Sequence, residues 1–348
     1  MKQFPVIEIT ASDPFERGVQ YGTQAKELIG TCIQYYKNKF AGQDWDSVVK
    51  YAMDYVPVIE ESMPEILAEA RGVAQGAGVP FGDIMVVNCR YEITKFPKIP
   101  ECTTGTILPK ASEGGKTYAW KNWDYASGIL DHVVILHFHT DDGYRAIGIT
   151  EAGQMVRDGM NSYGVAICNN NLQSVEDYPG SGIPATFLRR RVLASKSFEE
   201  AKEWILNSKR CVSNNTVLVG KGQALDFEAY PSGANIIEPD EDGILAHANH
   251  FVVHPELDAI HGRPKNRDAR FVELVKPKAG HITVEDIKEA LRDHKYYPLS
   301  ICGHTDPDGD DYGRDRMTVS SMIADFDAQE VHICAGNPCQ GEYIVYKL

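Results

Sequence analysis

The strongest constraint in this sequence is a change of pattern near residue 100. Up to Ile93, apolar residues recur at the spacing of amphipathic helices, whereas from Cys102 onward short runs rich in Thr, Val, Ile, Tyr and Trp are separated by turn residues. The segment 96–100 separates the two parts, and its two prolines cannot sit inside a continuing helix. The chain therefore joins a helical first part to a mostly β second part.

The first helix has a clear start signal. Asp13 is expected to be its N-cap, Pro14 occupies the first turn, and Glu16 follows three residues after the cap. Three more helical segments are expected at residues 47–55, ending before Pro57, at 62–74, and at 83–93.

The second part predicts two runs of strands with helices between them. Strands are expected at 103–108, 117–120, 132–139, 144–150, 164–168, 216–219, 224–229, 244–248, 317–324, 331–334 and 343–346. Helices are expected at 184–194, 198–207, 265–274 and 284–293. Because the regular β-α-β alternation of a parallel sheet is missing, the pattern predicts an α+β fold with two antiparallel sheets and helices outside them.

Charge excludes several classes of partner. The chain carries 35 Lys and Arg against 49 Asp and Glu in 348 residues, which gives a net charge of −14. Nucleic acid and anionic lipid both need a basic face, so neither is an expected partner. The tight basic run Arg189-Arg190-Arg191 falls in a helical pattern and is expected on a solvated face. No stretch approaches the roughly 20 apolar residues of a membrane-spanning helix, and no secretory leader precedes Glu8, so a cytoplasmic protein is expected.

Cysteine and histidine spacing predicts no metal site. The eight cysteines are scattered without a CxxC pair, which indicates mostly free, buried thiols in a reducing compartment. His137 and His139 share one face of a strand, but spacing places no Asp, Glu or Cys ligand beside them. His247 and His250 are interpreted in the same way. A metal site needs several ligands, so neither a metal nor a cofactor is expected.

Cys102 lies where the helical part gives way to a strand. Cysteine proteases of the Cys-His-Asn kind usually place their thiol at the start of a helix, and the β-like run after Cys102 argues against that arrangement. If the peptide bond before Cys102 is cut, the new α-amine, with an ordinary pKa of about 7.7–8.0, lies within reach of its own thiol. One residue then supplies both nucleophile and base. Position alone favours the simpler interpretation, a buried core cysteine.

A series of short motifs changes this balance. In chain order they are Val87-Asn88-Cys89-Arg90-Tyr91-Glu92, Glu101-Cys102-Thr103-Thr104, Lys121-Asn122-Trp123-Asp124, Glu151-Ala152-Gly153, Gly182-Ile183-Pro184, His247-Ala248-Asn249-His250 and Gly336-Asn337-Pro338-Cys339. Each motif is weak by itself, but the ordered set resembles the acyl-CoA:6-aminopenicillanic acid acyltransferase (isopenicillin N acyltransferase) family of cysteine-type N-terminal nucleophile hydrolases. The resemblance runs nearly from end to end.

The resemblance implies a four-layer αββα sandwich made as a precursor that cleaves itself before its nucleophile. In this sequence the cut falls between Glu101 and Cys102. It gives a helical α chain of residues 1–101 and a catalytic β chain of residues 102–348, which together form one domain.

The family also implies roles for four residues. Cys102 is the nucleophile, Asp124 holds the freed ammonium and the thiol in register, and Asn249 donates its side-chain amide to the oxyanion. An arginine near the C-terminal Thr-containing strand completes the set. Arg314 and Arg316 both fit that position, and Arg316 is preferred.

Two positions depart from the family pattern. Glu101 stands where the fungal acyltransferase has Gly, and its charge is expected to slow self-cleavage or make it depend on pH. Lys121 stands where the related bile-salt and penicillin V hydrolases carry Arg, which weakens any transfer of their substrates to this chain.

The expected activity is cleavage of a linear amide in a small N-acyl compound through a Cys102 thioester. Hydrolysis is favoured because the acidic chain shows no distinct cluster of basic residues for the phosphates of CoA. The alternative with the same site is an N-acyltransferase that uses an acyl-CoA thioester. A different class of alternative is an unprocessed, non-catalytic relative that binds a small molecule. The expected partners are the substrate and the two chains of the precursor, and homo-oligomerisation is left open.

Overall fold

The structure is a computed structural model that describes residues 2–93, 102–260, 266–309 and 314–348. The first part opens with strand β1 (Val6–Ile9), which is followed by helices. They are α1 (Pro14–Gln24), α2 (Lys26–Lys39), α3 (Trp45–Met53), α4 (Val56–Ser62), α5 (Pro64–Ala77), α6 (Phe81–Asn88) and α7 (Arg90–Ile93). Asp13 caps α1 as predicted, since its carboxylate accepts the backbone N–H of Glu16 at 3.0 Å. The predicted proline break at 96–100 lies outside the described residues.

The second part supplies two sheets. Its strands are β2 (Thr103–Ile107), β3 (Tyr118–Ala126), β4 (Val133–His139), β5 (Arg145–Glu151), β6 (Asp158–Asn161), β7 (Val165–Asn171), β8 (Asn214–Gly220), β9 (Gln223–Tyr230), β10 (Gly233–Ile237), β11 (Ile244–His247), β12 (Arg316–Asp325), β13 (Glu330–Ala335) and β14 (Tyr343–Lys347). The first sheet has the order β1-β4-β5-β6-β7-β8-β9-β10, and the second has the order β11-β2-β3-β12-β13-β14. All neighbours pair antiparallel except β1 and β4, which pair parallel.

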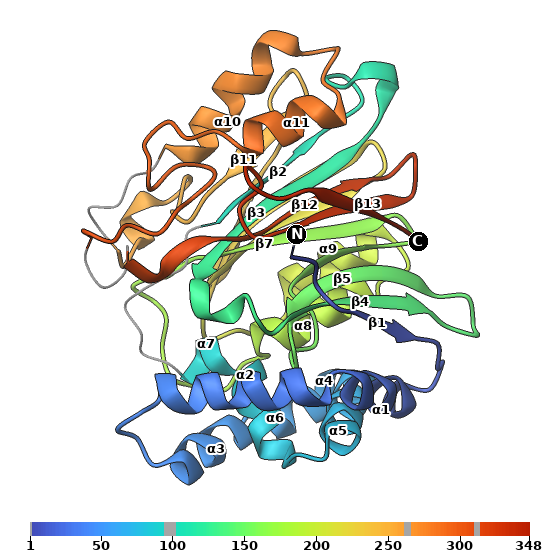
Figure 1. Ribbon diagram of the computed structural model, residues 1–348, viewed down its shortest axis with the longest axis vertical. Helices are drawn as coiled ribbons and strands as arrows, with labels where there is room; N and C mark the ends of the chain where they lie inside the picture. The colour runs from blue at the N-terminus through green and yellow to red at the C-terminus, as the bar shows by residue number, and fades with distance from the viewer. Residues whose placement is uncertain (1, 94–101, 261–265, 310–313) are drawn as a thin grey trace.

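The two sheets stack face to face between two layers of helices (Figure 1). Helices α10 (Arg267–Val275) and α11 (Val284–Leu291) cover the outer face of the six-stranded sheet, where Phe271 stacks on Trp120. The helices of the first part, together with α8 (Ala185–Leu193) and α9 (Phe198–Asn207), cover the eight-stranded sheet. The predicted αββα sandwich of an α+β fold is therefore confirmed.

Successive side chains of β4 point alternately into the two apolar cores on either side of the eight-stranded sheet. Ile135 belongs to the core between the two sheets, whereas its neighbours Val134 and Leu136 belong to the core beneath the helices. Because successive side chains of a strand point to opposite faces, a strand between two apolar layers must be apolar on both sides. The run Val133–Leu136 meets this requirement, and each of its residues is buried.

Several sequence predictions need correction. Strands β1, β6 and β10 were not expected. Strand β1 has four residues within a region of helical pattern, and it forms because it pairs with β4 more than a hundred residues away. Pro57 does not end a helix but lies in the first turn of α4, where the missing N–H costs no hydrogen bond.

The basic run Arg189-Arg190-Arg191 is not a solvated face. Arg189 and Arg190 are buried in the middle of α8, and Arg191 is partly buried. The Arg190 guanidinium donates to both carboxylate oxygens of Glu69 at 2.8 Å, which fixes α8 to α5. The local sequence shows the charge but not this distant partner, so the prediction was wrong.

Among the described residues, no helix combines the length and apolar character that crossing a bilayer requires.

Candidate active site

Cys102 immediately precedes β2, which lies between β11 and β3 in the six-stranded sheet. Its side chain is fully buried and packs in the core between the two sheets. The Cys102 Sγ lies 3.8 Å from the backbone carbonyl oxygen of Asp124, and Arg157 Nη2 donates to the same sulfur at 3.8 Å. The predicted nucleophile thus lies at the start of an interior strand, between a carbonyl group and a guanidinium.

The Asp124 carboxylate is held by two groups from the neighbouring strand. Thr318 lies opposite Asp124 in the β3–β12 pairing. Its hydroxyl donates to Asp124 Oδ1 at 2.6 Å, and Arg316 Nη2 donates to Oδ2 at 2.5 Å. Arg314 is exposed and donates to the backbone carbonyl of Gly309 instead. The geometry therefore selects Arg316 over Arg314 as the arginine beside Asp124.

Asn249 follows β11 and contacts the nucleophilic residue directly. Its carboxamide oxygen accepts the backbone N–H of Cys102, and its NH₂ group donates to the backbone carbonyl of Asn171 at 2.7 Å. Arg267 Nη2 lies 3.3 Å from the same carboxamide oxygen and 3.4 Å from the Cys102 carbonyl oxygen. The structure brings Asn249 to Cys102, but here the amide accepts from the backbone of Cys102, and its predicted donation to an oxyanion stays a prediction.

Arg157 is a site residue that the sequence analysis missed. It lies just before β6, it is fully buried, and its guanidinium lies 4.4 Å from the centre of the Trp123 ring. Its Nη1 donates to the Tyr91 hydroxyl at 2.8 Å. Burial opposes the charge of Arg157, but Tyr91, Cys102 and Asp158 raise its pKa above the ordinary value. It therefore brings a fixed positive charge to the sulfur.

Tyr91 connects the helical first part to this charge. Burial raises the pKa of the Tyr91 phenol, but the nearby guanidinium groups of Arg157, Arg90 and Arg189 bring it below the ordinary value. Arg90 Nη2 also donates to the Tyr91 hydroxyl at 3.2 Å. The motif at 87–92 that carried part of the resemblance thus packs against the candidate site.

Lys121 lies in the same layer as the nucleophile and is also buried. Its ammonium group donates to Asp158 Oδ2 at 2.7 Å and to the backbone carbonyl of Asn169. Burial lowers the pKa of Lys121, whereas Asp158 and Cys102 act in the opposite direction. The Asp158 pairing means that the charge of Lys121 is balanced within the protein.

Asn170 holds the backbone around the site together. Its NH₂ group lies 2.9 Å from the Thr104 hydroxyl on β2, 2.9 Å from the Asn215 side chain on β8 and 2.9 Å from the backbone carbonyl of Ala248. Through these contacts one buried side chain ties the nucleophile's strand to the segment that carries Asn249. No spacing motif marked Asn170, Arg157 or Arg267, because each acts through contacts between distant segments.

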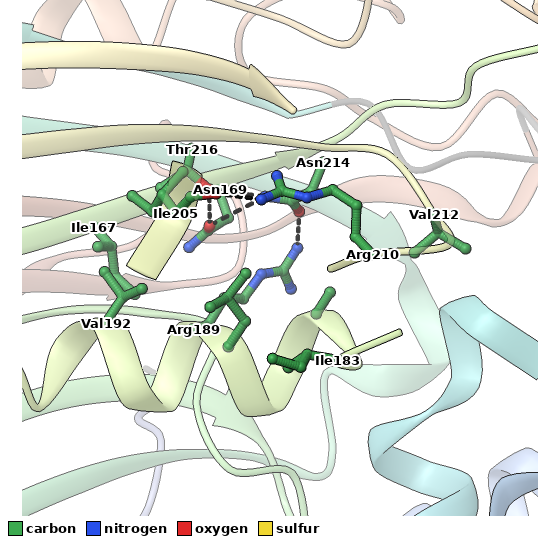
Figure 2. Close-up of a pocket in the computed structure, with 12 residues that line it drawn as sticks. Ile167, Asn169, Ile183, Arg189, Val192, Ile205, Arg210, Val212, Asn214 and Thr216 are labelled. Atoms are coloured by element: carbon green, nitrogen blue, oxygen red, sulfur yellow. Dashed lines mark hydrogen bonds between the residues drawn. The ribbon is translucent and has the colours of Figure 1, made fainter. Parts of the chain in front are cut away.

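A small pocket lies behind the site, between α8 and the strands β7 and β8 (Figure 2). Arg189 reaches across it to Asn214, and Asn214 and Thr216 both bond the carboxamide oxygen of Asn169. The Asn169 NH₂ group in turn donates to the backbone carbonyl of Arg157 at 2.7 Å. The pocket has a volume of about 20 Å³, which is room for about one water molecule. The pocket is too small for an acyl chain and forms part of the packing behind Arg157.

The structure supplies a partner that spacing did not place beside His137 and His139. Glu8 lies opposite His137 in the β1–β4 pairing, and its Oε2 lies 3.0 Å from His137 Nδ1 and 2.9 Å from His139 Nε2. These contacts join β1 to β4 at a partly exposed position.

His247 is likewise held by acidic groups. Its Nε2 lies 3.0 Å from Glu228 Oε1. Burial lowers the pKa of His247, but Asp226 and Glu228 together bring it up to about 9. His247 is thus part of a buried charge network with Asp226 and Glu228.

The sequence matches the acyl-coenzyme A:6-aminopenicillanic acid acyltransferase family over residues 111–340, which is more than half of the chain. It is 26% identical over 300 residues to the acyl-coenzyme A:6-aminopenicillanic-acid-acyltransferase 40 kDa form of Emericella nidulans, covering 83% of this chain and 82% of that protein.

Two solved structures are also similar. The Caenorhabditis elegans ortholog of N-acylethanolamine-hydrolyzing acid amidase has a TM-score of 0.46 and 16% identity, covering 64% of this chain and 92% of that one. A mutant of the conjugated bile acid hydrolase of Clostridium perfringens has a TM-score of 0.47 and 14% identity, covering 71% of this chain and 97% of that one. From the family match, the chain belongs to the acyl-coenzyme A:6-aminopenicillanic acid acyltransferase family.

Proposed function

We propose that this protein is a self-processing, cysteine-type N-terminal nucleophile enzyme that cleaves a linear amide of a small N-acyl compound through a thioester on Cys102. Cleavage between Glu101 and Cys102 divides the precursor into an α chain of 101 residues and a β chain of 247 residues. The two chains remain packed as one domain. Glu101 lies outside the described residues, so the geometry that supports the proposal is that of Cys102 and its surroundings.

One observation carries the proposal. The sulfur, the backbone nitrogen and the backbone carbonyl of Cys102 are each engaged by a polar group from another segment. The buried Arg157 contacts the sulfur, the partly buried Asn249 contacts the nitrogen, and the buried Arg267 contacts the carbonyl. A cysteine that only fills a core does not need its backbone and side chain fixed by cations and an amide. Such fixing is what a nucleophile requires if it is to react in one defined geometry.

This arrangement supports the following route for self-cleavage. The Cys102 sulfur attacks the carbonyl carbon of residue 101, the carbon–sulfur bond forms, and the bond from that carbon to the Cys102 nitrogen breaks. The thiol proton passes to the departing nitrogen, which becomes the free α-amine. Water then attacks the thioester, which releases the carboxylate end of the α chain and restores the thiol. Asn249, as acceptor of the Cys102 N–H, orients the nitrogen that leaves.

The mature site then repeats the same chemistry on substrate. The new α-amine takes the thiol proton, and the thiolate attacks the amide carbonyl of the substrate with the Arg157 cation beside it. A side-chain donor such as the Asn249 amide stabilises the oxyanion, a contribution of roughly 3–4 kcal/mol in comparable sites. The ammonium returns its proton to the leaving amine. Water hydrolyses the thioester, and the acid is released.

Among the described residues, the hydrogen-bond partners of the Cys102 sulfur are a carbonyl and a guanidinium, and neither is an imidazole. This observation supports the self-processing scheme over a cysteine protease that depends on histidine. In the scheme proposed here, no histidine takes the thiol proton.

The mass of the purified chain tests the proposal. Wild-type protein is expected to give two fragments that meet at the 101–102 bond, and C102A is expected to stay at full length. C168A is the matched control, because Cys168 is also a free, buried cysteine in the core between the sheets. It should be cut like wild type. If the wild-type chain stays uncut and has no amidase activity, the proposal is wrong and the protein is instead a non-catalytic binding protein.

The acyl acceptor is decided by product analysis. Processed enzyme is incubated with N-acyl amino acids and N-acyl amines of short and long chain, and separately with an acyl-CoA and an amine. We expect free acid as the main product in both cases. A CoA-dependent acyltransferase is the second candidate, favoured by the name of the Emericella nidulans relative. Formation of an N-acyl amine from acyl-CoA that exceeds hydrolysis supports that candidate and contradicts hydrolysis.

A further inference from the structure

Two cysteines and two histidines from two segments lie close together beside the six-stranded sheet. His294 follows α11, Cys302 and His304 lie between α11 and β12, and Cys339 lies in the turn between β13 and β14. One ligand atom from each residue lies within 4.8 Å of the others. Both cysteines are free thiols. We call these four residues the Cys2His2 cluster.

Four of the six donor–donor distances within the cluster are close to those of a tetrahedral site, and the other two are below 4.8 Å. Zinc binds sulfur at about 2.3 Å and imidazole nitrogen at about 2.0–2.1 Å. A tetrahedron with these bonds needs about 3.8 Å between two sulfurs, about 3.6 Å between sulfur and nitrogen, and about 3.3 Å between two nitrogens. The two sulfurs lie 3.6 Å apart, His304 Nε2 lies 3.6 Å from Cys302 Sγ and 3.5 Å from Cys339 Sγ, and the two imidazole Nε2 atoms lie 3.0 Å apart.

From this geometry we propose that the Cys2His2 cluster binds one zinc ion as a structural site. Two thiolates and two neutral imidazoles match the ligand preference of zinc and balance its two positive charges. Four protein ligands close the coordination sphere, so the ion is not expected to activate water. On binding, the two thiol protons are released to solvent and two sulfur–zinc bonds form.

A side-chain amide faces the Cys302 sulfur. The Asn337 NH₂ group lies 3.5 Å from Cys302 Sγ and donates to the backbone carbonyl of Gly303 at 2.6 Å. Donors of this kind around a metal-bound sulfur orient the ligand and offset part of its charge. Two free thiols without a metal have no comparable need for two imidazoles and an amide around them.

The cluster also adjoins the candidate active site. The Gly303 backbone N–H donates to the Thr318 hydroxyl at 2.8 Å, and the same hydroxyl donates to Asp124. A Cβ on Gly303 would lie 2.7 Å from the Arg316 guanidinium. A metal that fixes the Cys302–His304 turn would therefore also fix the residues that hold Asp124, without contacting the substrate.

The first test is the metal content of the full chain, purified without a metal-affinity step. We expect roughly one zinc per wild-type chain, and a loss of at least about tenfold in C302S and C339S because each removes one of four ligands. C334S and H281Q are matched controls outside the cluster, and both should retain zinc. C102A should retain it too, because the site does not depend on self-cleavage. Equal zinc content in C339S and wild type overturns the proposal.

The second test needs no variant and covers the case in which C302S fails to fold. Wild-type protein is stripped with a chelator under reducing conditions and titrated with cobalt(II). A tetrahedral thiolate site is expected to give strong visible absorption that saturates at one cobalt per chain and disappears when zinc is added. If this absorption does not appear, the proposal is wrong. The thiols of the denatured chain are also counted before and after reduction. Six thiols before reduction and eight after it would show that a disulfide is present instead, and this result would also overturn the zinc proposal.

Discussion

Arg316 and Asp124 form an ion pair of 2.5 Å in which both side chains are buried. Two charges out of water are costly unless each is matched, and removing one partner leaves the other uncompensated. The pair lies on β12 and β3, the two strands that join the nucleophile's side of the sheet to its C-terminal half. The ion pair therefore stabilises the sheet and also holds Asp124 in place. The backbone carbonyl of Asp124 faces the Cys102 sulfur.

The first prediction concerns this pair. In a C102A background, which prevents self-cleavage, R316M should lower the free energy of unfolding by about 3–5 kcal/mol because it removes the cation that pairs with the buried Asp124 carboxylate. The double change D124N/R316M should recover part of that loss. Urea unfolding of the variants measures both effects. R314M is the matched control, because Arg314 is exposed. Equal losses in R314M and R316M would contradict the role assigned to the pair.

The second prediction concerns Asn249. N249A should slow both self-cleavage and turnover by about 10²–10³-fold, because it removes the amide that orients Cys102 and is expected to stabilise the oxyanion. The value of kcat should fall more than KM changes. N207A is the control, since Asn207 is an exposed asparagine at the end of α9. An N249A enzyme that turns over within about threefold of wild type would exclude Asn249 from the proposed site.

The fold could be predicted where local signals decide the structure. Helix α9 has the predicted bounds, because Ser197 caps its first turn and the apolar pattern runs through to Asn207. Strand β1 could not be predicted in this way, since four residues become a strand only through pairing with β4. The same is true of Arg190, whose buried position depends on Glu69, a partner 121 residues away.

The candidate site shows the same division. The ordered motifs identified Cys102, Asp124, Asn249 and Arg316, and the structure brings these four residues together, although their chemical roles stay predictions. Arg157 comes from a turn before a strand that was not predicted, so nothing in its local sequence marks it.

The Cys2His2 cluster was missed for a related reason. Cys302 and Cys339 are 37 residues apart, and only the packing of two turns makes them neighbours. His294, Cys302 and His304 share one segment, but residues at this spacing match no common pattern of metal ligands, and the fourth member lies far along the chain. Spacing alone therefore did not mark the cluster.

The third prediction concerns the cation beside the sulfur. R157M should slow turnover by about 10–100-fold, because a hydrogen bond to a charged group contributes about 1.5–3 kcal/mol. R157K should restore part of the rate, and Y91F, which keeps the cation and removes one of its contacts, should have a smaller effect. The exposed Arg145 provides the control R145M. The rates of all variants are measured across pH. A purely structural role of Arg157 predicts that R157K is as slow as R157M, so the comparison of these two variants separates the effect of charge from the effect of packing.

The last prediction follows from Glu92, at the end of the helical first part. Its Oε1 accepts the backbone N–H of Ala185 at 2.8 Å, whereas Oε2 is buried without a hydrogen-bond partner among the described residues. Burial raises the pKa of Glu92 from 4.5 to about 7, although the Ala185 N–H and Arg90 act against this shift. The folded state therefore holds a proton that the unfolded state has already lost at mildly acidic pH. The stability that this proton contributes is complete below about pH 4.5 and is lost as pH rises to about 7.

The E92Q variant isolates this effect, because glutamine keeps the acceptor for Ala185 and cannot ionise. Urea unfolding of C102A and of C102A/E92Q between about pH 5 and pH 8 should show that the stability of E92Q relative to its parent rises with pH. The change should approach about 3 kcal/mol over the full titration. Asp177 and Asp226, whose pKa values burial raises to about 6, titrate in both proteins and cancel in the difference. A difference that stays constant with pH would show that Glu92 is ionised in the folded protein, because only a proton held in the folded state can produce this slope.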